Sequence, residues 1–261
     1  FIPANVTAFN ADTLRTKFWA GGLFPPLSSK RKDAGNELNH VSAHLFTDYG
    51  AGVDGFTFSG LANVYRFSAN GLSIAGIGNY VGGNMAGLQI GGVLNTNSLR
   101  TDGLQIAGVM NMTGIRQSGL QVAGINNVNR SNAYGIHVAG IGNYTHKTNV
   151  GLQIGGLFNY ARTVQGIQLA SIYNQSHRVQ GLQIGLVNSS RRVDGLQIGL
   201  FNFAKSAKFG GQIGLFNFVK DGYKQLEFSY DEMNFVDFSF RSGVQHFYNL
   251  FMVFCLENFQ H

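Results

Sequence analysis

Eleven variants of one short motif recur between Gly55 and Asn217, and this repeat constrains the fold more than any other feature of the chain. A unit reads Gly-Leu-Gln-Ile-Gly-Gly-x-x-Asn with small changes, and successive units are 16 residues apart six times, then 15, 15, 14 and 15 residues apart. A period this regular is typical of repeat architectures, in which each unit packs only against its neighbours. The units open at Gly55, Gly71, Gly87, Gly103, Gly119, Gly135, Gly151, Gly166, Gly181, Gly195 and Gly210.

Side chains alternate within each unit, as where Leu152 and Ile154 flank Gln153. This period of two indicates a strand with one buried face. We expect the apolar residues to face the core and the glutamines to form an uncharged polar outer face. The fold predicted is all-β, a repeat β-solenoid of about eleven 14–16-residue coils with an N-terminal β cap and C-terminal antiparallel β strands. The glutamines predicted to face outward are Gln89, Gln105, Gln121, Gln153, Gln168, Gln183, Gln197 and Gln212.

An asparagine closes the motif in every unit. Such a strict register predicts a buried amide ladder at a bend of the coil, in which each side chain bonds to the coils above and below. The alternative is a linear array of ligand-binding amides. The predicted structural ladder consists of Asn63, Asn79, Asn95, Asn111, Asn127, Asn143, Asn159, Asn174, Asn188, Asn202 and Asn217.

The sequence divides into three parts. We expect an N-terminal cap at 1–54, the repeat solenoid at 55–221 and an aromatic C-terminal β segment at 222–261. The last segment alternates aromatic and polar residues, as at Phe228 and Tyr230. The sequence ends at His261 directly after a strand-like run, without a turn or polar tail, which indicates a truncated boundary.

Positive charge is concentrated in the repeats, where twelve Lys and Arg residues between Gly55 and Gly222 face three acids. The cations fall 10 to 13 residues after the opening glycines, so stacked coils would align them along one edge. Such an edge would attract an anionic surface such as phosphorylated glycolipid, nucleic acid or acidic polysaccharide, or it would merely be solvated and prevent strand pairing with other molecules. The residues predicted for an anion-binding edge are Arg100, Arg116, Arg130, Lys147, Arg162, Arg178, Arg192 and Lys205.

Residues that carry catalysis or hold metals are not grouped in recognisable patterns. The scattered acids of the repeats predict no acid–base pair and no calcium-binding nonapeptide repeat. His40 and His44 lie in a strand-like stretch and predict no metal site, and no order of Ser, His and Asp points to a nucleophile. The longest apolar run, 250–256, is far shorter than the roughly 20 residues of a transmembrane helix. We expect no enzyme, no cofactor and no transmembrane helix.

Several motifs of the chain resemble those of a known protein family. Gly151-Leu-Gln-Ile-Gly-Gly-Leu-Phe-Asn, Phe24-Pro-Pro-Leu-Ser and Gly222-Tyr-Lys-Gln-Leu-Glu-Phe-Ser are similar to segments of bacterial cell-envelope surface-repeat proteins of the Bacteroidetes and spirochaete type. The resemblance covers roughly residues 20–250. It implies a location in the outer membrane or at the cell surface of a Gram-negative bacterium, and it supplies no catalytic residues.

The leading functional hypothesis is a non-enzymatic envelope protein that acts as scaffold, adhesin or interaction surface through its basic edge and its Gln/Asn ladders. Its expected partners are an anionic envelope glycolipid or another envelope protein, with no specific nucleic acid. The alternative is an outer-membrane, porin-like β-barrel built from short hairpins. Units near 16 residues argue against it, because a hairpin of membrane-spanning strands needs about 20 residues or more. A third hypothesis, a carbohydrate-active solenoid enzyme, lacks the carboxylates.

Overall fold

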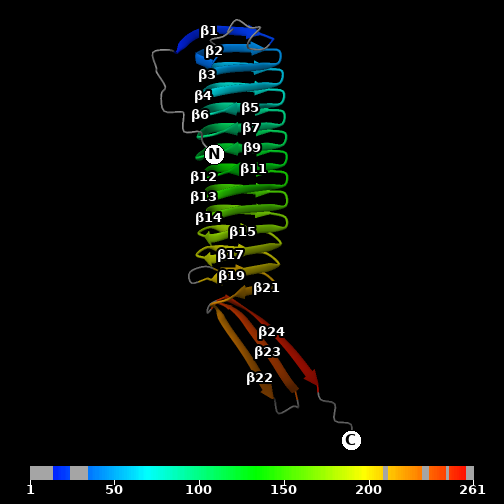
Figure 1. Cartoon of the computed structure of the whole chain (residues 1–261). Coiled ribbons are helices and arrows are strands. Elements are labelled where there is room, and N and C mark those ends of the chain that lie inside the picture. Colours follow the sequence, from blue (N-terminus) through cyan, green and yellow to red (C-terminus); the bar gives the residue numbers. More distant parts are fainter. Residues whose placement is uncertain (1–13, 24–34, 208–210, 231–234, 245–246, 257–261) are drawn as a thin grey trace. The chain divides into compact units, whose positions relative to one another are not determined.

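The chain folds as a β-solenoid of about eleven parallel coils, followed by a small antiparallel sheet (Figure 1). The computed structural model describes residues 14–23, 35–207, 211–230, 235–244 and 247–256, and within these ranges the chain is nearly all β with no α-helix. No helix there has the length and apolarity to cross a membrane. The chain divides into two compact units, residues 1–140 and 141–261, which are described separately.

Unit 1 consists of stacked parallel strands. They are β1 (Arg15–Gly22), β2 (Glu37–His44), β3 (Thr47–Ser59), β4 (Ala62–Ala75), β5 (Gly78–Val81), β6 (Asn84–Gly91), β7 (Leu94–Asn97), β8 (Arg100–Ala107), β9 (Met110–Thr113), β10 (Arg116–Ala123), β11 (Asn126–Asn129) and β12 (Asn132–Ala139).

Unit 2 continues the same coil pattern and then changes to antiparallel strands. Its coils contain β13 (Gly142–Gly155), β14 (Phe158–Ala170), β15 (Tyr173–Val179), β16 (Leu182–Ile184), β17 (Val187–Val193), β18 (Leu196–Ile198), β19 (Phe201–Ser206), β20 (Gly211–Ile213) and β21 (Phe216–Val219). The separate sheet contains β22 (Tyr223–Tyr230), β23 (Phe235–Val244) and β24 (Phe247–Leu256), paired antiparallel.

The sequence repeat sets the register of the strands. In β6 and β8, Gly87 lies opposite Gly103 and Gln89 opposite Gln105, so each residue pairs with its equivalent one unit later. The pairing is parallel, which requires coils rather than antiparallel hairpins. Because every strand stacks on an equivalent strand, identical side chains form rows along the coils.

The expected boundary between cap and repeat falls inside a strand. Gly55 lies within β3, and β3 pairs in parallel with β2 on one side and β4 on the other. Ser42 and Thr57 lie in register with each other, and Thr57 with Ser73, at the position that later coils fill with glutamine. The described strands of the N-terminal segment, β1 to β3, therefore already stack in parallel as part of the solenoid, because backbone pairing needs no complete motif. The residues of the expected cap at 1–13 and 24–34 lie outside the described ranges.

The prediction that the glutamines face outward is wrong. Gln183 is 0% exposed, whereas its neighbours Leu182 and Ile184 are only half-buried on the outer side. The predicted alternation is confirmed, but the buried face is the polar one. The physical reason is that stacked amides complete one another's hydrogen bonds, so their burial leaves few unsatisfied groups. The fully buried glutamines are Gln89, Gln105, Gln121, Gln153, Gln168, Gln183 and Gln197, and Gln212 is almost fully buried.

Buried apolar residues lie on both sides of the amides: one set is beside the bend that precedes each opening glycine, and alanines such as Ala107 and Ala123 occupy the fifth motif position. In unit 1, Val53, Tyr65, Ala69 and Val81 form one buried cluster. In unit 2, a second cluster contains Val193, Ala204, Ala207 and Val219. The interior of the coils is thus mixed, with amides at its centre and apolar side chains at both ends.

Candidate functional site

The asparagines form a hydrogen-bonded ladder inside each unit. In unit 2, the Nδ2 atom of Asn174 donates to Asn188 Oδ1 in the following coil at 3.0 Å and to the carbonyl oxygen of Ile184 at 2.7 Å. Asn188 repeats both bonds with Asn202 and Ile198. Each amide therefore stabilises a bend and links two coils. These buried groups are structural, and they offer no surface for a ligand.

A second ladder, of glutamines, runs beside the first in the opposite direction. Gln183 Nε2 donates to Gln168 Oε1 in the preceding coil at 2.7 Å, and Gln197 Nε2 donates to Gln183 Oε1 at 2.8 Å. The asparagines donate toward the C-terminus and the glutamines toward the N-terminus. Both ladders lie inside the coils, so the hypothesis that they form an interaction surface is wrong.

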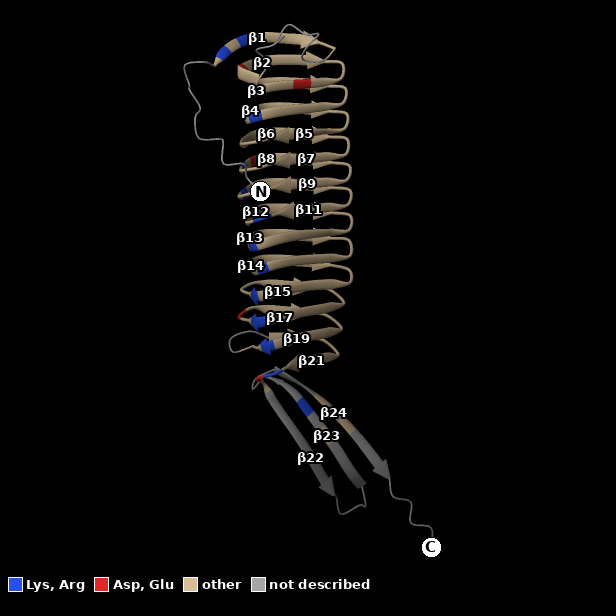
Figure 2. Ribbon diagram, viewed as in Figure 1, with Lys and Arg blue, Asp and Glu red and all other residues tan. Residues whose placement is uncertain are grey.

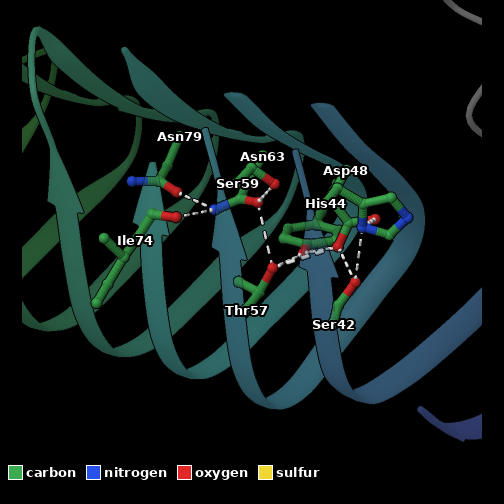
Figure 3. Close-up of polar contacts among 9 residues, drawn as sticks. Ser42, His44, Asp48, Thr57, Ser59, Asn63, Ile74 and Asn79 are labelled. Atoms are coloured by element: carbon green, nitrogen blue, oxygen red, sulfur yellow. Dashed lines mark hydrogen bonds and ion pairs between the residues drawn. The ribbon is translucent and has the colours of Figure 1, made fainter. Parts of the chain in front are cut away.

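A buried polar cluster around Asp48 begins the asparagine ladder in unit 1 (Figure 3). Asp48 lies in register with Asn63 and accepts hydrogen bonds from Ser42 at 2.5 Å, Thr57 at 3.2 Å and Tyr65 at 2.7 Å. Burial, and then the charge of Asp48, raise the pKa of Tyr65, so its hydroxyl stays protonated and donates. Three donors thus stabilise a carboxylate that replaces an amide of the ladder.

This cluster contains a Ser, a His and an Asp that the sequence pattern did not bring together. Its geometry differs from that of a nucleophilic triad, because Ser42 donates its hydroxyl hydrogen to Asp48 instead of to a histidine. Ser42 Oγ and Asp48 Oδ1 both lie near the same ring atom, His44 Nδ1, at 3.2 and 3.5 Å. All three side chains are buried, with no more than 2% exposed. The cluster is built to stabilise the coil.

His137 interrupts the glutamine ladder at the last coil of unit 1. It lies in register with Gln121, is 0% exposed, and neither ring nitrogen has a hydrogen-bond partner among the described residues. Burial lowers its pKa from 6.5 to about 4. The folded chain therefore holds a neutral imidazole at a pH where the unfolded chain binds a proton.

We expect this histidine to weaken the fold as the pH falls from 6.5 toward 4. In that window the unfolded state takes up the proton that the folded state refuses, so stability at pH 4.5 falls by about 2.5 kcal/mol relative to pH 8. Replacing His137 by glutamine should remove this loss, measured by urea unfolding at the two pH values. The matched control is His146→Gln, at an exposed histidine. An equal acid loss in wild type and His137→Gln would contradict the assignment.

The basic residues lie at the bend that precedes each opening glycine. The opposite bend is the glycine turn, which follows the strand at motif positions five and six, as at Gly91 and Gly92. In unit 1, Arg100 and Arg116 begin β8 and β10 and pair in register, and Arg130 follows β11 at the same bend. All three are exposed. The guanidinium of Arg116 also lies 4.5 Å from the ring centre of Tyr134.

The basic edge of unit 2 carries more Lys and Arg residues than that of unit 1. Figure 2 shows Lys and Arg of β13, β14, β15, β17 and β19 at one edge of the coils, and the opposite edge of these coils carries none. The predicted residues there are Lys147, Arg162, Arg178, Arg192 and Lys205. Asp194 accepts hydrogen bonds from Arg178 at 2.8 Å and Arg192 at 2.9 Å. Although partial burial raises the pKa of Asp194, the two arginines more than offset this and lower it.

The edge remains positive despite this pairing. Residues 141–221 contain eight Lys and Arg against two Asp. His177 lies between Arg162 and Arg191, and burial, followed by the charges of these two arginines, lowers its pKa. Crowded positive charge of this kind attracts anions. The anion-binding role of the edge stays a prediction.

Sequence reasoning missed a second surface, which consists of apolar rows on the outside of the coils. On one face of unit 2 the second and fourth motif positions stack in register, so Leu182 lies between Ile167 and Leu196, and Ile184 lies beside Ile198. In unit 1 the equivalent rows contain Leu88, Leu104 and Leu120. These side chains are partly exposed instead of buried.

The apolar rows continue around the glycine turn onto the other face. At the turn of unit 2 stands the corner row, in which Leu157, Ile172 and Leu186 are 45%, 49% and 47% exposed. Beyond it, aromatic side chains stack from coil to coil, as Tyr144 does on Tyr160 and Phe201 on Phe216, with ring centres 4.8 and 5.0 Å apart. The corner row consists of Ile141, Leu157, Ile172, Leu186, Leu200 and Leu215.

A signal for this inversion is present in the repeats themselves. The third position is glutamine in eight of eleven units, while the second and fourth positions vary among Leu, Ile, Phe and Val, with Gly211 in the last unit. A solvent-facing glutamine has no reason to stay so constant from unit to unit. A buried glutamine does have such a reason, because each amide of the ladder must complete the hydrogen bonds of the next one.

Among the described residues, no group of three or more His, Cys, Asp or Glu could hold a metal ion. In comparisons with protein-family models, curated proteins and solved structures, nothing matches this chain. The resemblance to cell-envelope surface-repeat proteins therefore stays a prediction from the motifs.

Proposed function

We propose that this chain is a non-enzymatic protein of the Gram-negative cell envelope, which acts as a scaffold or adhesin through its outer surface. One observation carries the proposal: the amides fill the interior of the coils, and the Leu, Ile and aromatic rows lie outside. Contiguous exposed apolar surface larger than a few hundred Å² is typical of interaction sites. The binding surface is thus the apolar rows together with the basic edge.

An envelope location agrees with this surface and with the motif resemblance. A chain whose apolar rows meet only water would associate with itself or with other apolar surfaces. An envelope supplies partners that combine apolar and anionic parts, such as phosphorylated lipids and membrane proteins. The rows and the edge match both parts of such partners.

The test is co-sedimentation of the purified chain with outer-membrane vesicles from a Gram-negative bacterium. We expect the wild type to pellet with the vesicles and the triple variant Leu157→Ser, Ile172→Ser, Leu186→Ser to stay largely in the supernatant. These side chains are exposed at the turn, so the coils should remain folded.

The matched control replaces Gln165 and Gln180 by serine. Both are exposed and lie outside the apolar rows, and the side chain of Gln165 donates to that of Gln180 at 3.0 Å. This variant should pellet like the wild type. The proposed surface would be refuted if the wild type did not bind the vesicles, or if the triple variant bound them as strongly as the wild type.

A further inference from the structure

We propose that the corner row of unit 2 inserts into one leaflet of an anionic phospholipid membrane, with the basic edge at the level of the lipid phosphates. This rests on the proposed function and names the partner of the same surface. Three properties of the coils support this placement: which sides are apolar, how far the apolar part extends, and where the cations begin.

The apolar surface surrounds the turn on three sides. In one coil, Leu182 and Ile184 lie on the first face, Leu186 at the turn and Val187 on the second face, and all four are at least partly exposed. A folded protein partner covers one face of a sheet. Acyl chains can pack around an edge from three sides at once, and they require no hydrogen bonds from it.

On the first face the length of the apolar part fits one leaflet, whereas on the second face it ends before the exposed Gln175. Gly181 to Gly185 covers four residue steps, about 13 Å in a strand, beside about 15 Å for half of the hydrocarbon core. Ile172 to Arg178 covers six steps, mostly within β15, which is about 20 Å. The headgroup region ends about 20–22 Å from the bilayer centre. An edge inserted to the midplane would therefore place Arg178 at the phosphates.

The charges complement this placement. The cations lie at the edge farthest from the corner row, and the turn edge of these coils carries neither Lys, Arg, Asp nor Glu (Figure 2). Basic residues near a membrane surface are attracted by anionic lipids, at about 1 kcal/mol each.

The experiment is flotation of the full chain with vesicles of phosphatidylethanolamine and phosphatidylglycerol, compared with vesicles of phosphatidylcholine alone. We expect binding to the anionic vesicles. The double variant Ile172→Asp, Leu186→Asp should reduce the bound fraction by about tenfold or more, because a charge in the hydrocarbon core is strongly disfavoured. The control Gln165→Ser, Gln180→Ser lies outside the apolar rows and leaves the charge of the basic edge unchanged, so it should bind within about threefold of wild type. Circular dichroism checks that both variants stay folded.

Depth is measured directly with a tryptophan probe. Trp19 is the only tryptophan of the chain and is exposed. In a Trp19→Phe background, Ile172→Trp should shift its fluorescence to the blue on vesicles and be quenched by acyl-brominated lipid. Gln180→Trp, near the basic edge, should be quenched much less.

Three results would overturn the inference. The first is equal quenching of tryptophan fluorescence at positions 172 and 180. The second is undiminished binding of the aspartate variant. The third is a wild type that pellets with outer-membrane vesicles but does not bind protein-free lipid vesicles. The last would leave the proposed function standing with an envelope protein as partner. The corner row would instead bind a second copy of the chain if two results came together. The wild type would fail to float with lipid, and light scattering would show lipid-free dimers that the Ile172→Asp, Leu186→Asp variant does not form. Failure of both vesicle experiments would remove the proposed function as well.

Discussion

Replacing Gln183 by leucine should destabilise the chain by about 4 kcal/mol, although leucine is more hydrophobic than glutamine and the position is buried. Gln183 donates to Gln168 and accepts from Gln197 and Ser190. Leucine leaves the Gln168 oxygen and the Gln197 nitrogen without these bonds inside the coil, and each unsatisfied buried group costs about 1–3 kcal/mol. Urea unfolding followed by circular dichroism measures the change.

The adjacent position supplies the matched control. Leu182→Gln puts the same amide one residue earlier, on the half-exposed outer row. We expect it to change stability by less than about 1 kcal/mol, because the amide there faces water. If Leu182→Gln were the more damaging substitution, the polar interior would be wrong and the original interpretation of an outward glutamine face would be right.

The sequence was sufficient to predict the coils and their register. Backbone pairing depends on the repeat length, and the asparagine that closes each unit marks equivalent positions in successive coils. Asn188 therefore stands between Asn174 and Asn202 as expected, and the strands pair in parallel. The C-terminal antiparallel strands were also predicted, because their alternating aromatic pattern begins where the repeat ends.

The inward face could not be chosen by hydrophobicity alone. Period two divides Leu182 and Ile184 from Gln183 but does not say which set is buried. The usual preference for apolar interiors favoured the wrong set. In-register stacking reverses it, because Gln168, Gln183 and Gln197 satisfy one another only when each lies directly beside the next. That cooperation belongs to the stack and is invisible in one unit.

Side-chain contacts between neighbouring coils could not be predicted either. Asp194 lies 16 residues from Arg178, and only the coil geometry brings their side chains within hydrogen-bond distance. The Asp48 cluster joins β2, β3 and β4, where the sequence departs from the repeat. The basic edge itself was predictable, since a constant offset from each opening glycine places cations at one bend.

Replacing Gly103 by alanine should be the most damaging single change, with an expected loss of about 5 kcal/mol. Its φ of +139° is unfavourable for any residue with a Cβ. An added Cβ would also lie 2.0 Å from the carbonyl oxygen of Gly87 in the preceding coil, so the two backbones would have to separate. Because the neighbouring coils repeat this contact at Gly87 and Gly119, the displacement cannot be absorbed locally.

Gly211→Ala is the control for this prediction, since its Cβ would meet only the end of the Leu196 side chain, at 3.3 Å. We expect it to change stability by no more than about 0.5 kcal/mol. Thermal unfolding of both variants, with far-ultraviolet circular dichroism as the signal, compares them under one condition. Equal and small effects would mean that the coils tolerate wider spacing, and the close contact of glycine with glycine would then not be what limits these positions. A large effect at Gly103 alone would explain why glycine opens every unit: the next coil can approach only where no side chain intervenes.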